Sequence, residues 1–176
     1  TKIMTCMLAI ESGRLEETVE VSKNAQRMPK VHLGMRAGET YKLKDLLYSL
    51  MLESHNDTAV AIAEHLGGSV EGFADMMNAK AAELGCKDTY FITPNGLDAK
   101  RDGKTHSTTA RDLAVIAAYA IKNPAFLEVI GTRSYSFSEL SGKRNFQVSN
   151  KNRFLDMMEG AIGIKTGFTC DAGYCF

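Results

Sequence analysis

The sequence predicts an α+β fold, in which strands from the two ends of the chain share one antiparallel sheet packed against a helical cluster. Helix-like spacing of apolar residues fills the middle of the chain, from about residue 43 to residue 130. Strand-like segments occur instead near the two ends, an alternating one at 17–21 and a β-leaning run at 163–169. The length of 176 residues fits one domain, which we expect to span residues 1–176.

The composition is typical of a soluble globular protein and indicates neither nucleic-acid binding nor a membrane-spanning segment. Apolar residues make up 44% and charged residues 24% of the chain. The formal net charge is +0 with scattered basic residues, so we expect no nucleic-acid partner. No apolar run reaches the length of a membrane span. The chain opens with Thr1-Lys2 inside a helical pattern, which indicates a fragment.

The N-terminal part is expected to hold one helix and one strand. Apolar residues recur at near-helical spacing over 2–11, and Ser12-Gly13 ends that helix. Residues 17–21 alternate and are expected to form a strand, and most of 22–39 is expected to be loop.

Three apolar helices are expected next, over residues 43–52, 58–66 and 70–84. Ser69 can cap the third of them. The first two are joined by only a few polar residues, so the chain should turn a tight corner there, buried among core helices.

The C-terminal half is expected to mix loops, helices and strands. Residues 90–98 are rich in turn formers, and Thr109 followed by Asp112 is typical of a helix start. The other expected elements are helices at 109–121 and 124–130, a hairpin of 133–137 with 146–148, a loop or short helix at 153–160, and strands at 163–169 and 174–176.

The spacing of cysteine and histidine residues predicts no metal site and no cofactor. The cysteines are Cys6, Cys86, Cys170 and Cys175. They form no CxxC pair, and the four histidines form no HExxH pattern. We expect four free thiols, with a bridge between Cys170 and Cys175 across a turn as the alternative.

One stretch near the C-terminus combines a cation, a hydroxyl and a glycine in a β-like run. Lys165 and Gly167 would share one face of a strand, with Thr166 on the other. Glycine in a strand often marks a close approach to the backbone, and the lysine suggests that the approaching group is an anion. The alternative is an edge-strand lysine that prevents aggregation.

Two further stretches hold reactive groups, and each also has an ordinary interpretation. Lys2 starts an apolar helix and can be a solvated end residue. Ser54-His55-Asn56 occupies the corner between two helices, but Ser54 followed by Asp57 is also a good helix N-cap. Taken in this order with Lys165, the three stretches favour a common site.

That order resembles the signature of the serine-type D-alanyl-D-alanine carboxypeptidases, members of the penicillin-binding-protein superfamily. The signature is Ser-x-x-Lys, then Ser-x-Asn, then Lys-Thr-Gly. Longer strings extend the resemblance over essentially the whole chain, at 46–57, 93–98, 109–114 and 163–169. The resemblance implies a transpeptidase/β-lactamase-like fold and removal of the terminal D-Ala from peptidoglycan stem peptides through a serine acyl-enzyme.

The resemblance also implies a role for each matching residue. Lys2 would take the proton of the nucleophilic serine. Ser54 would relay a proton to the leaving amine, and Asn56 would hold the substrate amide and Lys2. His55, in the variable middle position, is expected to point away.

The Lys-Thr-Gly stretch would bind the substrate. Lys165 and Thr166 would bind the terminal carboxylate of the peptide, and Gly167 would leave room for the peptide along the strand edge. The backbone N–H of Phe168 would form half of the oxyanion hole.

The resemblance places the nucleophilic serine two positions before Thr1, so residues 1–176 alone are not expected to form an acyl-enzyme. The family's next strand, its accessory domain and its membrane-anchoring tail are also absent from this sequence, so any membrane association would come from such segments. The expected partners are peptidoglycan stem peptides and β-lactam antibiotics, outside the cytoplasm at the cell envelope.

Two alternative functions stay open. A serine β-lactamase shares the three motifs but needs a carboxylate that activates water, and the loop at 93–98 has no Glu in a suitable setting. A non-enzymatic penicillin-binding sensor or cell-wall-binding module on the same fold is the second alternative.

Overall fold

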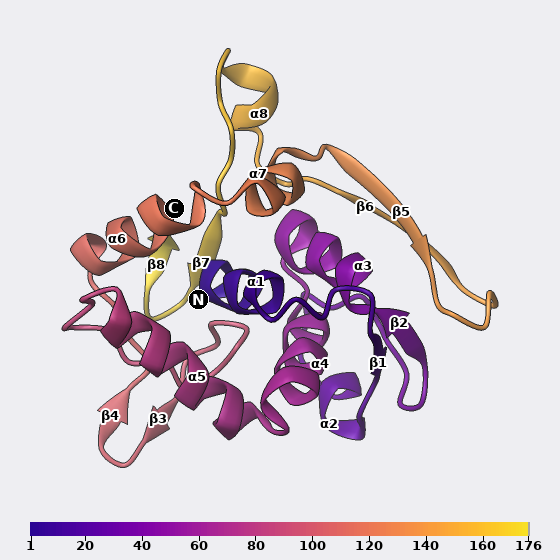
Figure 1. Ribbon diagram of the computed structural model, residues 1–176, viewed down its shortest axis with the longest axis horizontal. Coiled ribbons are helices and arrows are strands. Elements are labelled where there is room, and N and C mark those ends of the chain that lie inside the picture. The colour runs from indigo at the N-terminus through magenta and orange to yellow at the C-terminus, as the bar shows by residue number, and fades with distance from the viewer. Residues whose placement is uncertain (176) are drawn as a thin grey trace.

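Helices form the centre of the molecule in the computed structural model, which describes residues 1–175 (Figure 1). The first helix, α1 (Lys2–Glu11), is surrounded by other helices, and its residues from Ile3 to Ala9 are all buried. A helix that is apolar on all sides can be stable only inside a core. The N-terminal residues are thereby fixed at the middle of the fold.

The expected apolar helices are confirmed, with one change at the corner between the first two. The expected helix at 43–52 is divided into α3 (Leu43–Tyr48) and a π-helical turn, η1 (Ser49–Glu53). It is followed by α4 (Asn56–Gly67) and α5 (Val70–Glu83). Leu43, Leu46, Leu47, Leu50 and Ile62 are among the largest fully buried side chains of this group.

Side-chain caps begin several of the remaining helices. Thr109 accepts a hydrogen bond from the N–H of Asp112 at 3.1 Å, which confirms the expected start of a helix there. Ser22 caps a four-residue helix, so the expectation of mostly loop in that region was wrong locally. These helices are α2 (Lys23–Gln26), α6 (Ala110–Ala120), α7 (Pro124–Gly131) and α8 (Phe154–Met157).

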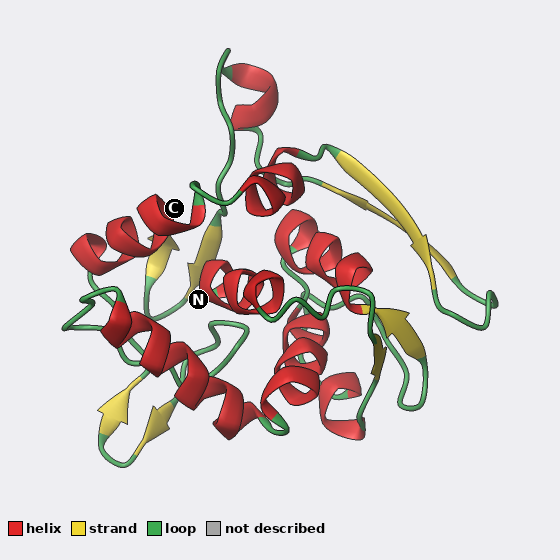
Figure 2. Cartoon of the chain, in the orientation of Figure 1, coloured by secondary structure: helices red, strands yellow, loops and turns green. Residues whose placement is uncertain are grey.

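The α+β class is confirmed, but the strands are paired differently from the expected single sheet. They form four separate antiparallel pairs within residues 1–175, three of them at the edge of the view in Figure 2 and the β7–β8 pair between α6 and α1. The pairs are β1 (Thr18–Glu20) with β2 (Thr40–Lys42), β3 (Lys100–Arg101) with β4 (Lys104–Thr105), β5 (Ser134–Ser138) with β6 (Asn145–Ser149), and β7 (Gly167–Thr169) with β8 (Gly173–Cys175).

The N-terminal and C-terminal strands do not pair with each other in the described part of the chain. β1 and β7 lie on opposite sides of α1 in the view of Figure 1. Each strand pairs with the next strand along the chain, β1 with β2 and β7 with β8. The expected C-terminal strand at 174–176 corresponds to β8 up to Cys175, and residue 176 lies outside the described residues.

Within residues 1–175, no single helix is long and apolar enough to cross a membrane. Taken together, α6 and α7 have sufficient length and apolar content, but they are bent by 105° at the break between them.

Candidate active site

The candidate site begins at the first residue of α1, where the Lys2 amine lies between two acceptors. Lys2 Nζ is 3.1 Å from Oδ1 of Asn56 and 2.5 Å from the backbone O of Asn95. A neutral amine carries two N–H bonds and one lone pair. When both N–H bonds are donated to these oxygens, the lone pair takes the remaining tetrahedral direction and is free to accept a proton.

Burial and a second cation adjust the basicity of Lys2. Its pKa is lowered from 10.5 to about 7, first because burial disfavours the ammonium and then because Lys165 places another positive charge nearby. A lysine with a pKa near neutrality is partly uncharged at physiological pH. Lys2 therefore has both the geometry and the charge state that a general base requires.

Ser54 lies where the backbone leaves η1 in a strained conformation. Its φ of 70° and ψ of 31° fall in the left-handed region. A π-helical turn and a left-handed residue other than glycine are both enriched at functional sites. The N-cap of α4 is His55 and not Ser54, so the alternative interpretation of Ser54 as a helix cap was wrong.

The strain at Ser54 predicts an unusual order of stability between two variants. We expect Ser54→Gly to be more stable than Ser54→Ala by about 1 kcal/mol, because glycine adopts a positive φ without the Cβ penalty. Because both variants lack the hydroxyl, they differ only at Cβ. Urea denaturation measures the difference between their free energies of unfolding. The same Ala/Gly comparison at Ala82, exposed within α5, should have the opposite sign. Equal stabilities at position 54 would contradict the strain.

Asn56 is held in one orientation by its neighbours. Its side-chain Nδ2 donates to the backbone O of Pro29 at 3.2 Å, while Oδ1 accepts from Lys2. Its backbone N–H donates to the O of Val31 at 2.8 Å. Because one end of the amide faces a carbonyl and the other faces an amine, a flipped side chain would lose both bonds.

Asp57 anchors the loop that supplies these carbonyls. Its buried carboxylate accepts the backbone N–H groups of Leu33, Gly34 and Met35 at 2.9, 2.8 and 3.1 Å. It also accepts the N–H of Thr58 at 2.9 Å. A buried charge needs such donors to offset its desolvation, and here they fix the loop against α4.

The buried His55 side chain contacts Ser49 and Glu53 rather than Lys2. Its Nδ1 is 2.8 Å from Oγ of Ser49, and its Nε2 is 3.4 Å from Oε2 of Glu53. Burial lowers the pKa of His55 below its usual value. These contacts give His55 a place in the core beneath the corner.

Lys165 and Thr166 precede β7 and do not lie within a strand. The expected strand at 163–169 is confined to Gly167–Thr169, because residues 161–166 have no strand partner in the described chain. Lys165 Nζ donates to the backbone O of Thr166 at 2.6 Å. Burial, and then the charge of Lys151, lowers the pKa of Lys165 to about 8.

β7 has room beside it for a peptide. Among the described strands it pairs only with β8. A Cβ added at Gly167 would meet no atom closer than Cys175, at 3.9 Å, and the Phe168 side chain is 61% exposed. A free strand edge with little side-chain bulk suits an added peptide strand.

The loop at 93–98 connects α1 to β7 through hydrogen bonds, a role that the sequence does not reveal. Its Asn95 carbonyl accepts from Lys2, and its Pro94 carbonyl accepts from Oγ1 of Thr5 at 2.7 Å. Asp98 Oδ1 accepts from Oγ1 of Thr169 on β7 at 3.0 Å. The available signal was the turn pair of Asn95 with Gly96, but the direction of a backbone carbonyl cannot be read from residue identity.

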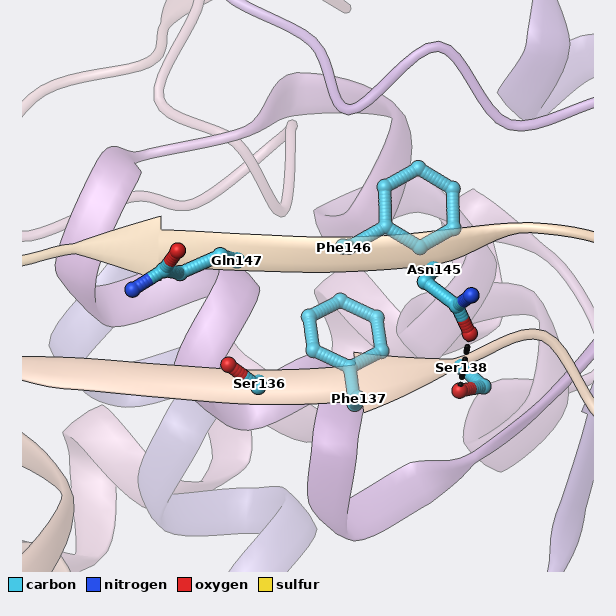
Figure 3. Close-up of a pocket in the computed structure, with 6 residues that line it drawn as sticks. All are labelled: Ser136, Phe137, Ser138, Asn145, Phe146 and Gln147. Carbon is cyan, nitrogen blue, oxygen red and sulfur yellow. Dashed lines mark hydrogen bonds between the residues drawn. The ribbon is translucent and has the colours of Figure 1, made fainter.

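Surface hollows also occur away from this site. One is lined by Lys87, Asp88, Thr89, Tyr90, Lys104, Thr105 and Ser107 and includes titratable side chains. A shallow hollow on the β5–β6 hairpin is lined by Ser136, Phe137, Ser138, Asn145, Phe146 and Gln147 (Figure 3). It contains no titratable side chain. Residues 1–175 contain no group of three His, Cys, Asp or Glu residues that could hold a metal ion. All four cysteines are free thiols, with Cys6 and Cys86 buried.

Comparisons with known proteins assign the chain to a family. The D-alanyl-D-alanine carboxypeptidase family matches residues 1–176. D-alanyl-D-alanine carboxypeptidase DacF of Bacillus subtilis is 35% identical over 180 residues, covering 99% of this chain and 45% of its own length. DacB2 of Mycobacterium tuberculosis, with the same description, is 35% identical over 168 residues, covering 96% of this chain and 56% of its own length.

Solved structures give the same result. A D-alanyl-D-alanine carboxypeptidase from Mycobacterium tuberculosis H37Rv superposes with a TM-score of 0.89 at 33% identity, covering 98% of this chain and 64% of that structure. The chain spans about half the length of the curated relatives it matches. The match over all its residues shows that this chain belongs to the D-alanyl-D-alanine carboxypeptidase family.

Proposed function

We propose that the protein containing this chain removes the terminal D-Ala from peptidoglycan stem peptides through a serine acyl-enzyme. The observation that carries the proposal is the Lys2 amine, held by Asn56 and Asn95 with a pKa of about 7. A serine two positions before Thr1 would lie one helical turn from Lys2 and share its face. Lys2 would then be the base that this weak nucleophile needs.

The reaction proceeds in two steps. The serine Oγ attacks the penultimate D-Ala carbonyl and its proton passes to the Lys2 lone pair, while the backbone N–H of Phe168 donates to the oxyanion. The C–N bond then breaks, and the departing D-Ala amine receives a proton through the Ser54 hydroxyl. Water hydrolyses the ester and restores the serine.

The substrate is oriented by groups around the reacting bond. Lys165 and Thr166 bind the terminal carboxylate, which makes the enzyme a carboxypeptidase. Asn56 binds the amide of the substrate, and the peptide lies along the free edge of β7 beside Gly167. A β-lactam, which carries a carboxylate next to a reactive amide, occupies the same position as an inhibitor. The substrate places the enzyme outside the cytoplasm, at the cell envelope.

Intact-mass spectrometry of the longer protein that carries residues 1–176 and the upstream serine tests the proposal. After exposure to benzylpenicillin, we expect a mass increase equal to one penicilloyl group, together with D-Ala release from a D-Ala-D-Ala peptide. Absence of any adduct would contradict the serine acyl-enzyme.

The same experiment separates the two alternatives. A sensor would form the adduct but release no D-Ala, and a β-lactamase would lose the adduct rapidly with catalytic penicillin hydrolysis. The hydrogen-bond partners of Lys2 and of Asn56 include no carboxylate that could activate the deacylating water, which favours the carboxypeptidase.

A further inference from the structure

His106 lies against the start of the loop that carries Asn95. Its Nδ1 is 2.9 Å from the backbone N of Ile92 and 3.3 Å from that of Thr93. Both of these groups are N–H donors, so Nδ1 must be an unprotonated acceptor. Nε2 then carries the proton and donates it to Oγ1 of Thr1 at 2.8 Å. The contacts define one tautomer of a neutral imidazole.

These contacts connect His106 to the Lys2 amine through three residues of backbone. Nδ1 fixes the N–H groups of Ile92 and Thr93, and the Asn95 carbonyl that accepts from Lys2 follows two residues later. On the other side of the loop, Thr5 holds the carbonyl of Pro94. His106 and Thr5 therefore hold the loop between them.

We propose that neutral His106 is a positioning residue, which fixes the Asn95 carbonyl so that the lone pair of Lys2 points toward the nucleophile. The inference rests on the proposed role of Lys2 as general base. If the loop were released, the Asn95 carbonyl would rotate and the amine would keep only Asn56 as a fixed acceptor. Water would also reach the amine, which is otherwise partly buried.

The surroundings of His106 keep the ring neutral. A proton on Nδ1 would face two N–H donors and displace the loop. Burial lowers the pKa of His106 below its ordinary value of 6.5, while the carboxylate of Asp98 acts in the opposite direction. His106 thus keeps its acceptor throughout the pH range in which Lys2 titrates.

Two substitutions at position 106 separate the acceptor role of Nδ1 from the donor role of Nε2. In His106→Asn the Oδ1 atom can take the position of Nδ1 and keep the acceptor, whereas His106→Gln can keep only the donor at the position of Nε2. We expect His106→Gln to lower the rate of acylation by a fluorescent penicillin by about 10²-fold, as for a misplaced catalytic group. We expect His106→Asn to stay close to the wild-type rate.

The pH profile distinguishes positioning from a general loss of structure. In His106→Gln, the midpoint of the rise in acylation rate should move to higher pH, because a more hydrated Lys2 keeps its proton longer. In His106→Asn it should stay in place. Equal rates and equal midpoints in wild type and both variants would overturn the proposal.

Two further measurements test the proposal if the wild type is not acylated or if the variant does not fold. If wild-type protein forms no adduct, the proposed function fails. An NMR titration of the Lys2 ε-methylene still compares the titration midpoint of Lys2 in wild type and in the variants. Equal midpoints would overturn the positioning role of His106. If His106→Gln does not fold, ¹⁵N NMR of the wild-type ring decides. We expect an unprotonated Nδ1, and a proton on Nδ1 would overturn the proposal.

Discussion

Replacing Lys2 with methionine is expected to lower the rate of β-lactam acylation by about 10³-fold, the range typical of a lost general base. Methionine keeps most of the length and the apolar stem of lysine, so α1 should still pack. The amine that lies between Asn56 and Asn95 is removed. Stopped-flow acylation of the longer protein by a fluorescent penicillin measures the effect.

Two controls show whether the base or the charge of Lys2 is required. Lys2→Arg keeps a positive charge but cannot lose a proton at these pH values, so it should be as slow as Lys2→Met. Lys44→Met, at an exposed position, should leave the rate unchanged. A rapid Lys2→Arg variant would show that the cation and not the base is used.

The pH dependence of wild-type acylation follows from the same residue. Lys2 accepts a proton only when it is uncharged, and its pKa is lowered to about 7. The rate should therefore rise as the pH increases through about 7 and should be lost below it. An unperturbed lysine would instead give a rise near its ordinary value of 10.5.

The helical part of the fold could be predicted because packing and capping are local properties of the sequence. The apolar spacing in α1 and α3 reports which face is buried, and Thr109 supplies its own cap for α6. The strand pairing could not be predicted in this way. The strands have two to five residues each, too few for an alternating pattern to specify a distant partner.

The structure brings Lys2 and Asn56 of the predicted site into contact, but the arrangement of the backbone around them could not be predicted. The periodicity of apolar residues continues from α3 into η1, so nothing in it marks the π-helical turn or the left-handed φ of Ser54. The second acceptor of Lys2 is a backbone carbonyl, which every residue possesses. The tautomer of His106 likewise depends on two N–H groups that are fixed only by the tertiary fold.

Burial of two lysines in one site links substrate binding to base strength. Lys165 lowers the pKa of Lys2, and burial lowers the pKa of Lys165 itself. An incoming carboxylate would neutralise Lys165 as it binds. The bound substrate would thereby reduce the repulsion between Lys165 and Lys2 that keeps Lys2 deprotonated. The affinity of Lys165 for the substrate carboxylate and the basicity of Lys2 are therefore coupled and cannot be optimised independently.

Replacing Lys165 with alanine is expected to lower kcat/KM for a D-Ala-D-Ala peptide by about 10²-fold, which is equivalent to about 3 kcal/mol. The reason is that the terminal carboxylate of the substrate loses a partly desolvated partner. A peptide that ends in a carboxamide is the matched control. It should be a poor substrate for wild type and should lose little more in Lys165→Ala. The variant should also show its rise in acylation rate at higher pH, since Lys2 loses a neighbouring cation. Equal losses for the acid and the amide peptide would show that Lys165 does not bind the carboxylate.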